Sequence, residues 1–284
     1  MTWTISAQNA DMNLMIELRD LIKQVVQSYD YQNIPLLYSG GVDSSTVLAC
    51  LLSLGVKPVL YNFQFGEYAS EDNKVAKSVA LHFDLDLRIV KVPRDEKSLF
   101  CDAKKVIKSL NISTKTHVQC SIPFLYMSRQ IAKDGYNQCF MAMAADDLLG
   151  TDRHANVAFY SGGEQQFRQY RKQKIDDSSA SDFSCMKIAK QNHVEVIDVF
   201  RDKRVINFLL QKTMRELNKP KQKQILLNAF PEFWGAGKWY RKNKSLQVVS
   251  GIRDAHDTLL ESRYNLRSHK AIVGIYNDIL QGKL

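Results

Sequence analysis

Residues 34–45 read Ile-Pro-Leu-Leu-Tyr-Ser-Gly-Gly-Val-Asp-Ser-Ser, and this stretch decides the fold. An apolar strand runs into Gly40 and Gly41, and an apolar helical pattern follows over residues 46–54. Glycine adopts backbone angles closed to other residues and lets a ligand approach the main chain. The N–H groups at the start of a helix favour a bound anion, with the helix dipole behind them. An ordinary capped strand-to-helix turn is the competing interpretation, but the whole string favours a phosphate site.

The polar side chains of this loop suit a nucleotide. Ser39, Ser44 and Ser45 offer hydroxyl donors. Asp43 offers a carboxylate for a divalent cation beside phosphate oxygens. The loop is not a Walker A motif, because no Gly-Lys-Ser/Thr follows at the required spacing.

The segment Ser39-Gly40-Gly41-Val42-Asp43-Ser44 resembles the pyrophosphate loop of the ATP pyrophosphatase (PP-loop) superfamily. That superfamily includes asparagine synthetases, GMP and NAD synthetases, argininosuccinate synthetases and tRNA-modifying thiolases. The resemblance implies cleavage of ATP between its α- and β-phosphates, which yields an adenylated substrate and pyrophosphate. It also implies a role for each loop residue: Ser39, Gly40, Gly41 and Ser44 cradle the pyrophosphate, and Asp43 holds Mg²⁺.

A second marker follows an apolar strand expected at residues 138–145. Paired carboxylates, Asp146 and Asp147, come directly after this strand and are a metal-site candidate. The segment at residues 142–150 resembles Gly-Glu-Gly-Ala-Asp-Glu-Leu-Phe-Gly of asparagine synthetases and β-lactam synthetases. The resemblance implies that Asp146 joins Asp43 in binding magnesium and pyrophosphate. Met143 stands where that family has a glutamate associated with substrate binding and amine activation, so the acceptor stays open.

The first half of the chain alternates strands with helices. Strands are expected at residues 59–65 and 85–92, and a helix is expected at residues 71–83. This order predicts an α/β fold, a HUP-like doubly wound parallel sheet with the nucleotide loop at the carboxyl end of its first strand. In relatives, backbone at the end of the second strand holds the adenine, which implies Tyr61, Asn62 and Phe63 here.

The remaining segments are expected to be mainly helical. Residues 12–29 carry one apolar face and predict a leading helix. The expected parts are a leading helix at 1–33, the α/β domain at 34–200 and a helical C-terminal part at 201–284. Residues 153–184 are polar and predict a short helix and a mobile loop, with 176–181 the best candidate for disorder. Further helices are expected at residues 95–110, 122–134, 203–217, 251–261 and 268–280.

Lysines in the C-terminal part are the candidate catalytic cations. Lys223 lies in a stretch that resembles the asparagine synthetase sequence Lys-x-x-Leu-Arg-x-Ala, with Leu227 in place of the arginine. Lys242 and Lys244 both fit a later Arg-x-Lys stretch, so their register stays open. Preorganised cations of this kind stabilise the leaving pyrophosphate and the charge developing at the α-phosphorus. The alternative for any single lysine is a solvated surface charge.

One further segment resembles the asparagine synthetase sequence Glu-Val-Arg-x-Pro-Phe-Leu-Asp. It runs from residue 195 to 202, and three of its positions differ from the family. In the family this segment closes the core and positions later helices. A structural role is therefore favoured over a catalytic one for Glu195 and Asp202.

Composition limits the partners and the compartment. The chain has 284 residues, 45% hydrophobic and 24% charged, with a net charge of +9, which suits phosphorylated or polyanionic ligands. A generally basic soluble protein explains the charge slightly better, so nucleic acid is possible but not favoured. The five cysteines form no Cys-x-x-Cys pair, which disfavours a zinc knuckle and indicates reduced thiols in the cytoplasm. No apolar run approaches the roughly 20 residues that span a bilayer, so no membrane is expected.

The leading hypothesis is an ATP-dependent, AMP- and pyrophosphate-forming ligase of the asparagine synthetase type, with ATP and Mg²⁺ as cofactors. It would adenylate a small-molecule acceptor, most simply a carboxylate, for attack by an amine. Position 2 is Thr2 rather than a catalytic cysteine, so no N-terminal glutaminase domain is expected. Free ammonia, a substrate amine or a separate glutaminase subunit would then supply the nitrogen. The alternatives are a tRNA- or nucleobase-modifying PP-loop enzyme and a catalytically reduced nucleotide-binding protein.

Overall fold

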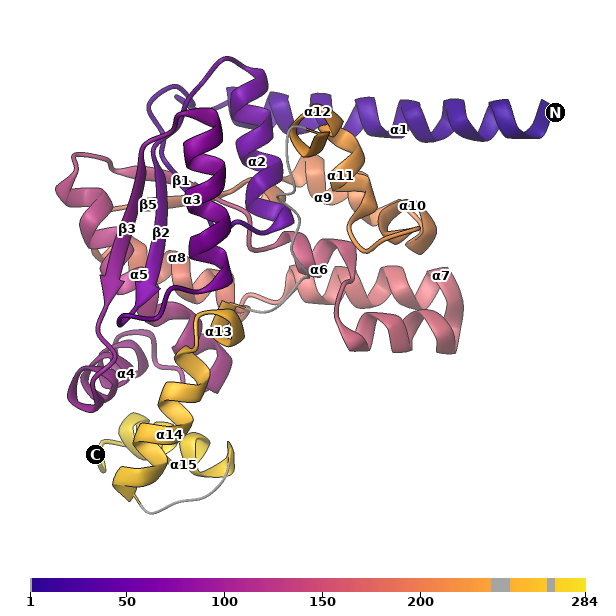
Figure 1. The fold of residues 1–284 in the computed structure, drawn as a ribbon. Helices are drawn as coiled ribbons and strands as arrows, with labels where there is room; N and C mark the ends of the chain where they lie inside the picture. Colours follow the sequence, from indigo (N-terminus) through magenta and orange to yellow (C-terminus); the bar gives the residue numbers. More distant parts are fainter. Residues whose placement is uncertain (1, 236–245, 265–268) are drawn as a thin grey trace. The chain divides into compact units, whose positions relative to one another are not determined.

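The computed structural model describes residues 2–235, 246–264 and 269–284. Its strands form one sheet in the order β3-β2-β1-β4-β5, and the registered pairs β1–β4 and β2–β3 are parallel (Figure 1). The predicted α/β class with a HUP-like parallel sheet is confirmed. The order reverses direction between β1 and β4, which makes this pair the topological switch point, where open α/β sheets bind ligands. The strands are β1 (Leu36–Leu37), β2 (Leu60–Phe65), β3 (Leu87–Val92), β4 (Gln138–Met141) and β5 (Glu195–Asp198).

The chain divides into two compact units that interleave along the sequence. The first, called here the loop unit, comprises Met1–Val59, Phe140–Ser178 and Ile197–Arg241. The second, called the groove unit, comprises Leu60–Cys139, Ser179–Val196 and Lys242–Leu284. The boundaries at residues 34 and 201 that the sequence suggests remain a prediction.

In the loop unit, the helix α1 packs on α2, α9 and α11 (Figure 1). Its predicted apolar face is confirmed, because Leu18, Ile22 and Val26 are fully buried. Burial of this apolar face holds α1 against α2, the helix that follows the glycine loop. The helices of this unit are α1 (Thr2–Gln27), α2 (Val42–Ser53), α6 (Ala145–Leu149), α7 (Arg153–Asp176), α9 (Lys203–Leu210), α10 (Met214–Asn218), α11 (Gln224–Ala229) and α12 (Pro231–Gly235).

The segment expected to hold a short helix and a mobile loop is instead almost wholly helical. The helix α7 has two limbs that meet at Gly162 and Gly163, whose backbone angles are not helical. Phe159 of the first limb packs edge-on against Phe167 of the second, with ring centroids 6.0 Å apart. The polar composition of this segment suggested a loop, but most of its polar residues lie on the exposed faces of a helix. The apolar spacing that buries Phe167 and Ile175 is helical.

In the groove unit, α3 and α5 both pack on β2 and β3, while α8 packs on α5. The helix α5 begins at Lys115 instead of the expected residue 122, and it includes Pro123 in its interior. Val118 and Ile122 are both fully buried and continue the apolar face toward the N-terminus. The helices of this unit are α3 (Glu71–Phe83), α4 (Glu96–Leu110), α5 (Lys115–Lys133), α8 (Ser181–Gln191), α13 (Leu246–Val249), α14 (Ile252–Tyr264) and α15 (His269–Leu280). Across the described part of the chain, no helix combines the length and apolarity needed to cross a membrane.

A buried histidine ties α14 to α15. His256 is fully buried, and its Nδ1 lies 2.6 Å from the hydroxyl of Tyr276. Beside it, Lys115 of α5 forms an ion pair with Asp257. Burial, with a smaller contribution from the positive charge of Lys115, lowers the pKa of His256 to about 3. The imidazole is therefore neutral in the folded protein at physiological pH.

This histidine should make the fold sensitive to acid. In the unfolded chain its pKa returns to 6.5, so between that pH and about 3 the unfolded state binds one more proton than the folded state. Stability should therefore fall as the pH falls through this window, by about 1.4 kcal/mol per pH unit at most. Urea unfolding at several pH values should show this slope in the wild type and lose it in His256→Gln. The exposed His154→Gln is the matched control, and equal slopes in all three proteins would contradict the assignment.

Candidate functional site

The glycine loop lies at the end of β1, in the loop unit. Gly40 has φ +73°, a left-handed conformation that favours glycine, and Gly41 is the extended N-cap of α2. The Ser39 hydroxyl oxygen lies 3.1 Å from that of Ser44 and accepts a hydrogen bond from the Gly41 N–H at 3.2 Å. The helix α2 begins at Val42, four residues before the apolar pattern that predicted it. The loop thus presents hydroxyls and the positive end of a helix dipole together.

Ser45 has a different hydrogen-bond partner from Ser39 and Ser44. Its side chain is fully buried, and its hydroxyl lies 3.0 Å from that of Tyr38, which is also buried. The contact joins the end of β1 to the first turn of α2. Ser45 therefore supports the loop from inside, and its contact with a ligand remains a prediction.

The second acidic segment follows β4, the neighbour of β1 in the sheet. The strand was expected to continue to residue 145 but ends at Met141. One reason is that the Ala144 N–H donates to the buried Asp198 carboxylate at 2.8 Å instead of to a strand. The short helix α6 starts at Ala145 and places Asp146 in its first turn. Because β1 and β4 are parallel neighbours, the segments after them leave the same edge of the sheet.

Lys223 joins the two acidic segments. Its Nζ lies 2.6 Å from Asp43 and 2.7 Å from Asp146, while its own side chain is only 2% exposed. Asp43 and Lys223 are 180 residues apart in the sequence. With Asp146 they form one ion triad, in which the lysine is buried and the two carboxylates are partly exposed. Burial alone would lower the pKa of Lys223, but the charges of Asp43 and Asp146 outweigh burial and hold that pKa above its ordinary value. The ammonium is therefore charged at neutral pH.

The backbone of Lys223 is held in a left-handed conformation, with φ +62°. The Asn218 side chain accepts a hydrogen bond from the Lys223 N–H at 2.9 Å and donates to the Leu149 carbonyl, the end of α6, at 2.7 Å. Gln222 donates to the Thr151 carbonyl at 2.6 Å. The turn that carries Lys223 is thus tied at two points to the segment that carries Asp146. Sequence reasoning missed Asn218, since no local pattern distinguishes it from a surface amide.

Arg171 braces the same region from α7. It is fully buried, and it donates to the carbonyls of Leu148 and Leu209 at 2.8 and 2.9 Å and to those of Leu210 and Lys212 at 3.3 and 2.9 Å. Burial lowers the pKa of Arg171 to about 10, so it is still charged at neutral pH. Carbonyls at helix ends carry the negative end of the helix dipole, which suits a cation. Sequence reasoning assigned no role to Arg171, although its spacing from Phe167 and Ile175 places all three on one helix face.

Two sets of predicted residues remain. Tyr61, Asn62 and Phe63 are on β2 in the groove unit, where the Tyr61 hydroxyl donates to Asp134 and the Asn62 side chain accepts from Asn73. Their contact with adenine remains a prediction. Lys242 and Lys244 lie outside the described residues.

The segment at residues 195–202 has local structural contacts. The Glu195 carboxylate accepts a hydrogen bond from Gln138 at 2.7 Å. Asp202 is the N-cap of α9 and accepts from the Arg204 N–H at 2.8 Å. These contacts agree with the structural role favoured for both residues.

The carboxylates of the loop unit could bind a metal ion that is also bound by a nucleotide, and they suit a free ion less well. Among the described residues, no group of three or more His, Cys, Asp or Glu side chains could hold a metal ion. The two carboxylates that meet at Lys223 are Asp43 and Asp146. Magnesium commonly binds one or two protein carboxylates and takes its other ligands from substrate phosphates and water. The residues present therefore suit a magnesium–nucleotide complex better than a free ion.

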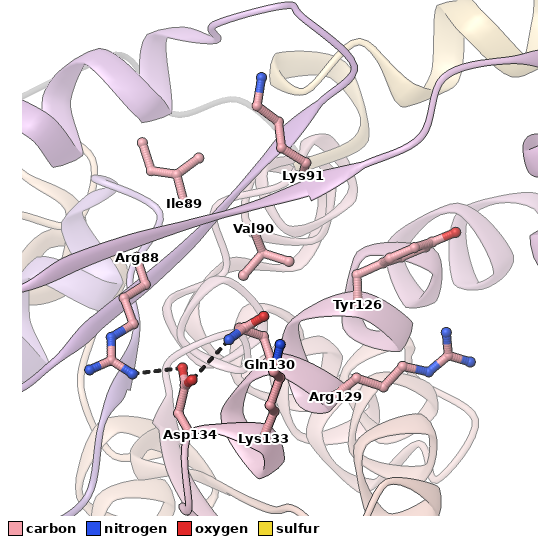
Figure 2. Close-up of a pocket in the computed structure, with 9 residues that line it drawn as sticks. All are labelled: Arg88, Ile89, Val90, Lys91, Tyr126, Arg129, Gln130, Lys133 and Asp134. Atoms are coloured by element: carbon pink, nitrogen blue, oxygen red, sulfur yellow. Dashed lines mark hydrogen bonds and ion pairs between the residues drawn. The ribbon is translucent and has the colours of Figure 1, made fainter.

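An open groove lies in the groove unit, between the edge strand β3 and α5 (Figure 2). It has a volume of about 710 Å³, and four of its lining residues are basic: Arg88, Lys91, Arg129 and Lys133. Their charge is largely balanced. Arg88 pairs with Asp134 and Asp86, at 2.7 and 3.0 Å, and Lys91 pairs with Glu67 at 2.9 Å. The groove is therefore a weak candidate for polyanion binding.

A parallel sheet with a Ser-Gly-Gly loop after one switch-point strand and an acidic helix after the other is the arrangement of the PP-loop, ATP-utilising enzymes. The sequence profile of the family described as asparagine synthase matches residues 17–197, and the chain belongs to this family. The chain is also similar to the 7-cyano-7-deazaguanine synthase of Thermoplasma volcanium, at 33% identity over 134 residues. That match covers 45% of this chain and 52% of the relative, so the chain spans about half of the relative's length. The predicted membership of the superfamily is confirmed, and with it the general class of enzyme.

Proposed function

We propose that the protein is an AMP- and pyrophosphate-forming ligase, which adenylates a carboxylate for attack by ammonia or an amine. One observation carries the proposal: two carboxylates that follow the switch-point strands converge on one buried lysine, Lys223. A cation fixed beside the glycine loop is what cleavage of ATP at its α-phosphorus requires. The family relationship supports the same class of chemistry.

The first step would use the loop residues and Lys223. A carboxylate oxygen attacks the α-phosphorus, the bond from that phosphorus to the bridging oxygen breaks, and pyrophosphate leaves with the electron pair. Ser39, Ser44 and the N–H groups at the start of α2 would hold the pyrophosphate oxygens. Lys223 would neutralise the charge that develops on them. Magnesium, held by Asp43 and Asp146, would supply further positive charge at the phosphates.

In the second step the nitrogen of ammonia or an amine attacks the acyl carbon and AMP leaves. The nitrogen loses a proton in this step, and the thioether of Met143 cannot accept it. A group other than residue 143 therefore takes the proton. Free ammonia, a substrate amine and a separate glutaminase subunit are the three sources of nitrogen that the proposal allows.

Asp43→Asn should lower AMP formation by about 10³-fold, because it removes one charge that orients both the metal and Lys223. The assay is AMP release from ATP and Mg²⁺ in the presence of a host metabolite extract. Asp30→Asn, an exposed acid close by in the sequence, is the matched control and should retain the wild-type rate. The melting temperature of each variant shows whether the fold is intact. An Asp43→Asn protein that releases AMP at the wild-type rate would refute the metal assignment.

A nucleobase or nucleic acid is the second candidate for the group that is modified. It is supported by the relative whose name makes it a synthase of 7-cyano-7-deazaguanine. Exchange of labelled pyrophosphate into ATP, tested separately with a pool of carboxylates and a pool of nucleobases and nucleosides, separates the two candidates. Mass spectrometry of the products then identifies the acceptor. ATP binding without exchange or AMP formation in either pool would support a catalytically reduced nucleotide-binding protein.

A further inference from the structure

Lys223 already holds the two carboxylates that the proposed function assigns to magnesium. Its Nζ is within 2.6 Å of Asp43 and 2.7 Å of Asp146, so its ammonium donates a charge-assisted hydrogen bond to each. Asp43 is 18% exposed and Asp146 is 47% exposed, so solvent reaches both carboxylates while it scarcely reaches the lysine. A second cation that approached the same oxygens would meet the ammonium at very short range.

The charges of the triad argue against a divalent cation there. Two carboxylates and one ammonium carry a net charge of −1, whereas the carboxylates alone carry −2. A dication is therefore attracted less strongly, and it must also replace hydrogen bonds that are already made. Like charges a few ångströms apart in a partly buried site repel one another strongly, even at an effective dielectric constant of about 20.

Hydrogen bonds hold the main chain of Lys223 in place, whereas its side chain can change conformation. Asn218 holds the Lys223 N–H, and the adjoining Gln222 is tied to the Thr151 carbonyl. The long lysine side chain can still swing its ammonium from a carboxylate to a nearby anion. Nucleotide phosphates beside the glycine loop would be such an anion.

We propose that Lys223 is the site's own counter-ion: it keeps divalent cations off Asp43 and Asp146 until nucleotide phosphates draw its ammonium away. This inference rests on the proposed function for the identity of the nucleotide. It adds a coupling between the two ligands, by which the metal ion binds well only together with the nucleotide. By thermodynamic linkage the metal ion must then raise nucleotide affinity by the same factor.

The test measures binding of Mn²⁺ without nucleotide, from the loss of the electron paramagnetic resonance signal of the free ion. Wild-type protein should bind Mn²⁺ weakly at neutral pH. Lys223→Met should bind one Mn²⁺ at least tenfold more tightly. Lys221→Met, which removes an exposed charge two residues away, is the matched control and should match the wild type. The double variant Lys223→Met with Asp43→Asn should lose the new site, which would locate it at the triad.

Unchanged Mn²⁺ affinity in a folded Lys223→Met protein would overturn the inference. If that variant melts early, Lys223→Gln removes the same charge while keeping a polar side chain, and the same comparison applies. After correction for the Mn²⁺ that the analogue binds in protein-free buffer, addition of a non-hydrolysable ATP analogue should tighten Mn²⁺ binding to the wild type at least tenfold. An analogue that binds without tightening Mn²⁺ binding would refute the coupling, whereas an analogue that does not bind would refute the nucleotide site of the proposed function. The nucleotide-free comparison of wild type with Lys223→Met would still decide the role of the lysine.

Discussion

Lys223→Met is expected to lower ATP–pyrophosphate exchange by about 10³-fold or more, measured with the acceptor pool that supports exchange in the wild type. The loss corresponds to about 4 kcal/mol of transition-state stabilisation, a typical value for a preorganised charge in a partly water-excluded site. The lysine suits this role because it is 2% exposed and lies beside the carboxylates that flank the glycine loop. Its charge would stabilise the leaving pyrophosphate without the free-energy cost of reorganising solvent.

Two further variants show whether charge or shape matters at this position. Lys223→Arg keeps the charge, but its planar fork cannot reproduce a single nitrogen that meets two carboxylates, so an intermediate rate is expected. Lys221→Met removes an exposed charge and should leave the rate unchanged. A Lys223→Met enzyme that works at the wild-type rate would assign the catalytic charge to another residue. Lys242 and Lys244 would then be the next to test.

Arg171→Met is expected to lower the free energy of unfolding by about 3–5 kcal/mol. The substitution leaves the carbonyls of Leu148, Leu209, Leu210 and Lys212 without the guanidinium that satisfies them. Each buried acceptor that loses its partner costs about 1–3 kcal/mol, although some will find water. The guanidinium also stacks on the Phe167 ring, 4.5 Å from its centroid, so packing is lost as well.

Urea unfolding followed by circular dichroism measures this loss. Lys172→Met is the matched control, because Lys172 is the next residue and its ion pair with Asp176 is exposed. Exposed pairs contribute about 0–1 kcal/mol, so its midpoint should scarcely move. Equal midpoints for Arg171→Met and the wild type would show that the four carbonyls are satisfied by other means.

Much of the fold could be predicted from the sequence, because its signals are local. Alternating strands and helices with short connections predicted the parallel sheet, and Glu71–Phe83 was predicted with both of its bounds. The glycine loop could be recognised from its whole string of glycine and polar residues after a strand, and the structure shows that Gly40 is left-handed there. The start of α5 was placed wrongly, and only a short helix was expected where the two limbs of α7 form. A proline in one and a run of polar residues in the other hide the buried face that forms only on packing.

For the site, the sequence by itself determined the identities of Asp43, Asp146 and Lys223 as candidates. Residue type and position after a strand made Asp43 and Asp146 candidates, whereas Lys223 was a candidate only through the resemblance to asparagine synthetases. Only the tertiary structure decided that one ammonium bridges both carboxylates. It also revealed Asn218 and Arg171 as the residues that hold the surrounding segments. The hydrogen bonds of Asn218 and Arg171 go to backbone carbonyls and N–H groups, which every sequence contains. The pattern of side chains along the sequence therefore could not predict these two roles. Those contacts exist only because the folded chain brings together segments that are far apart in the sequence.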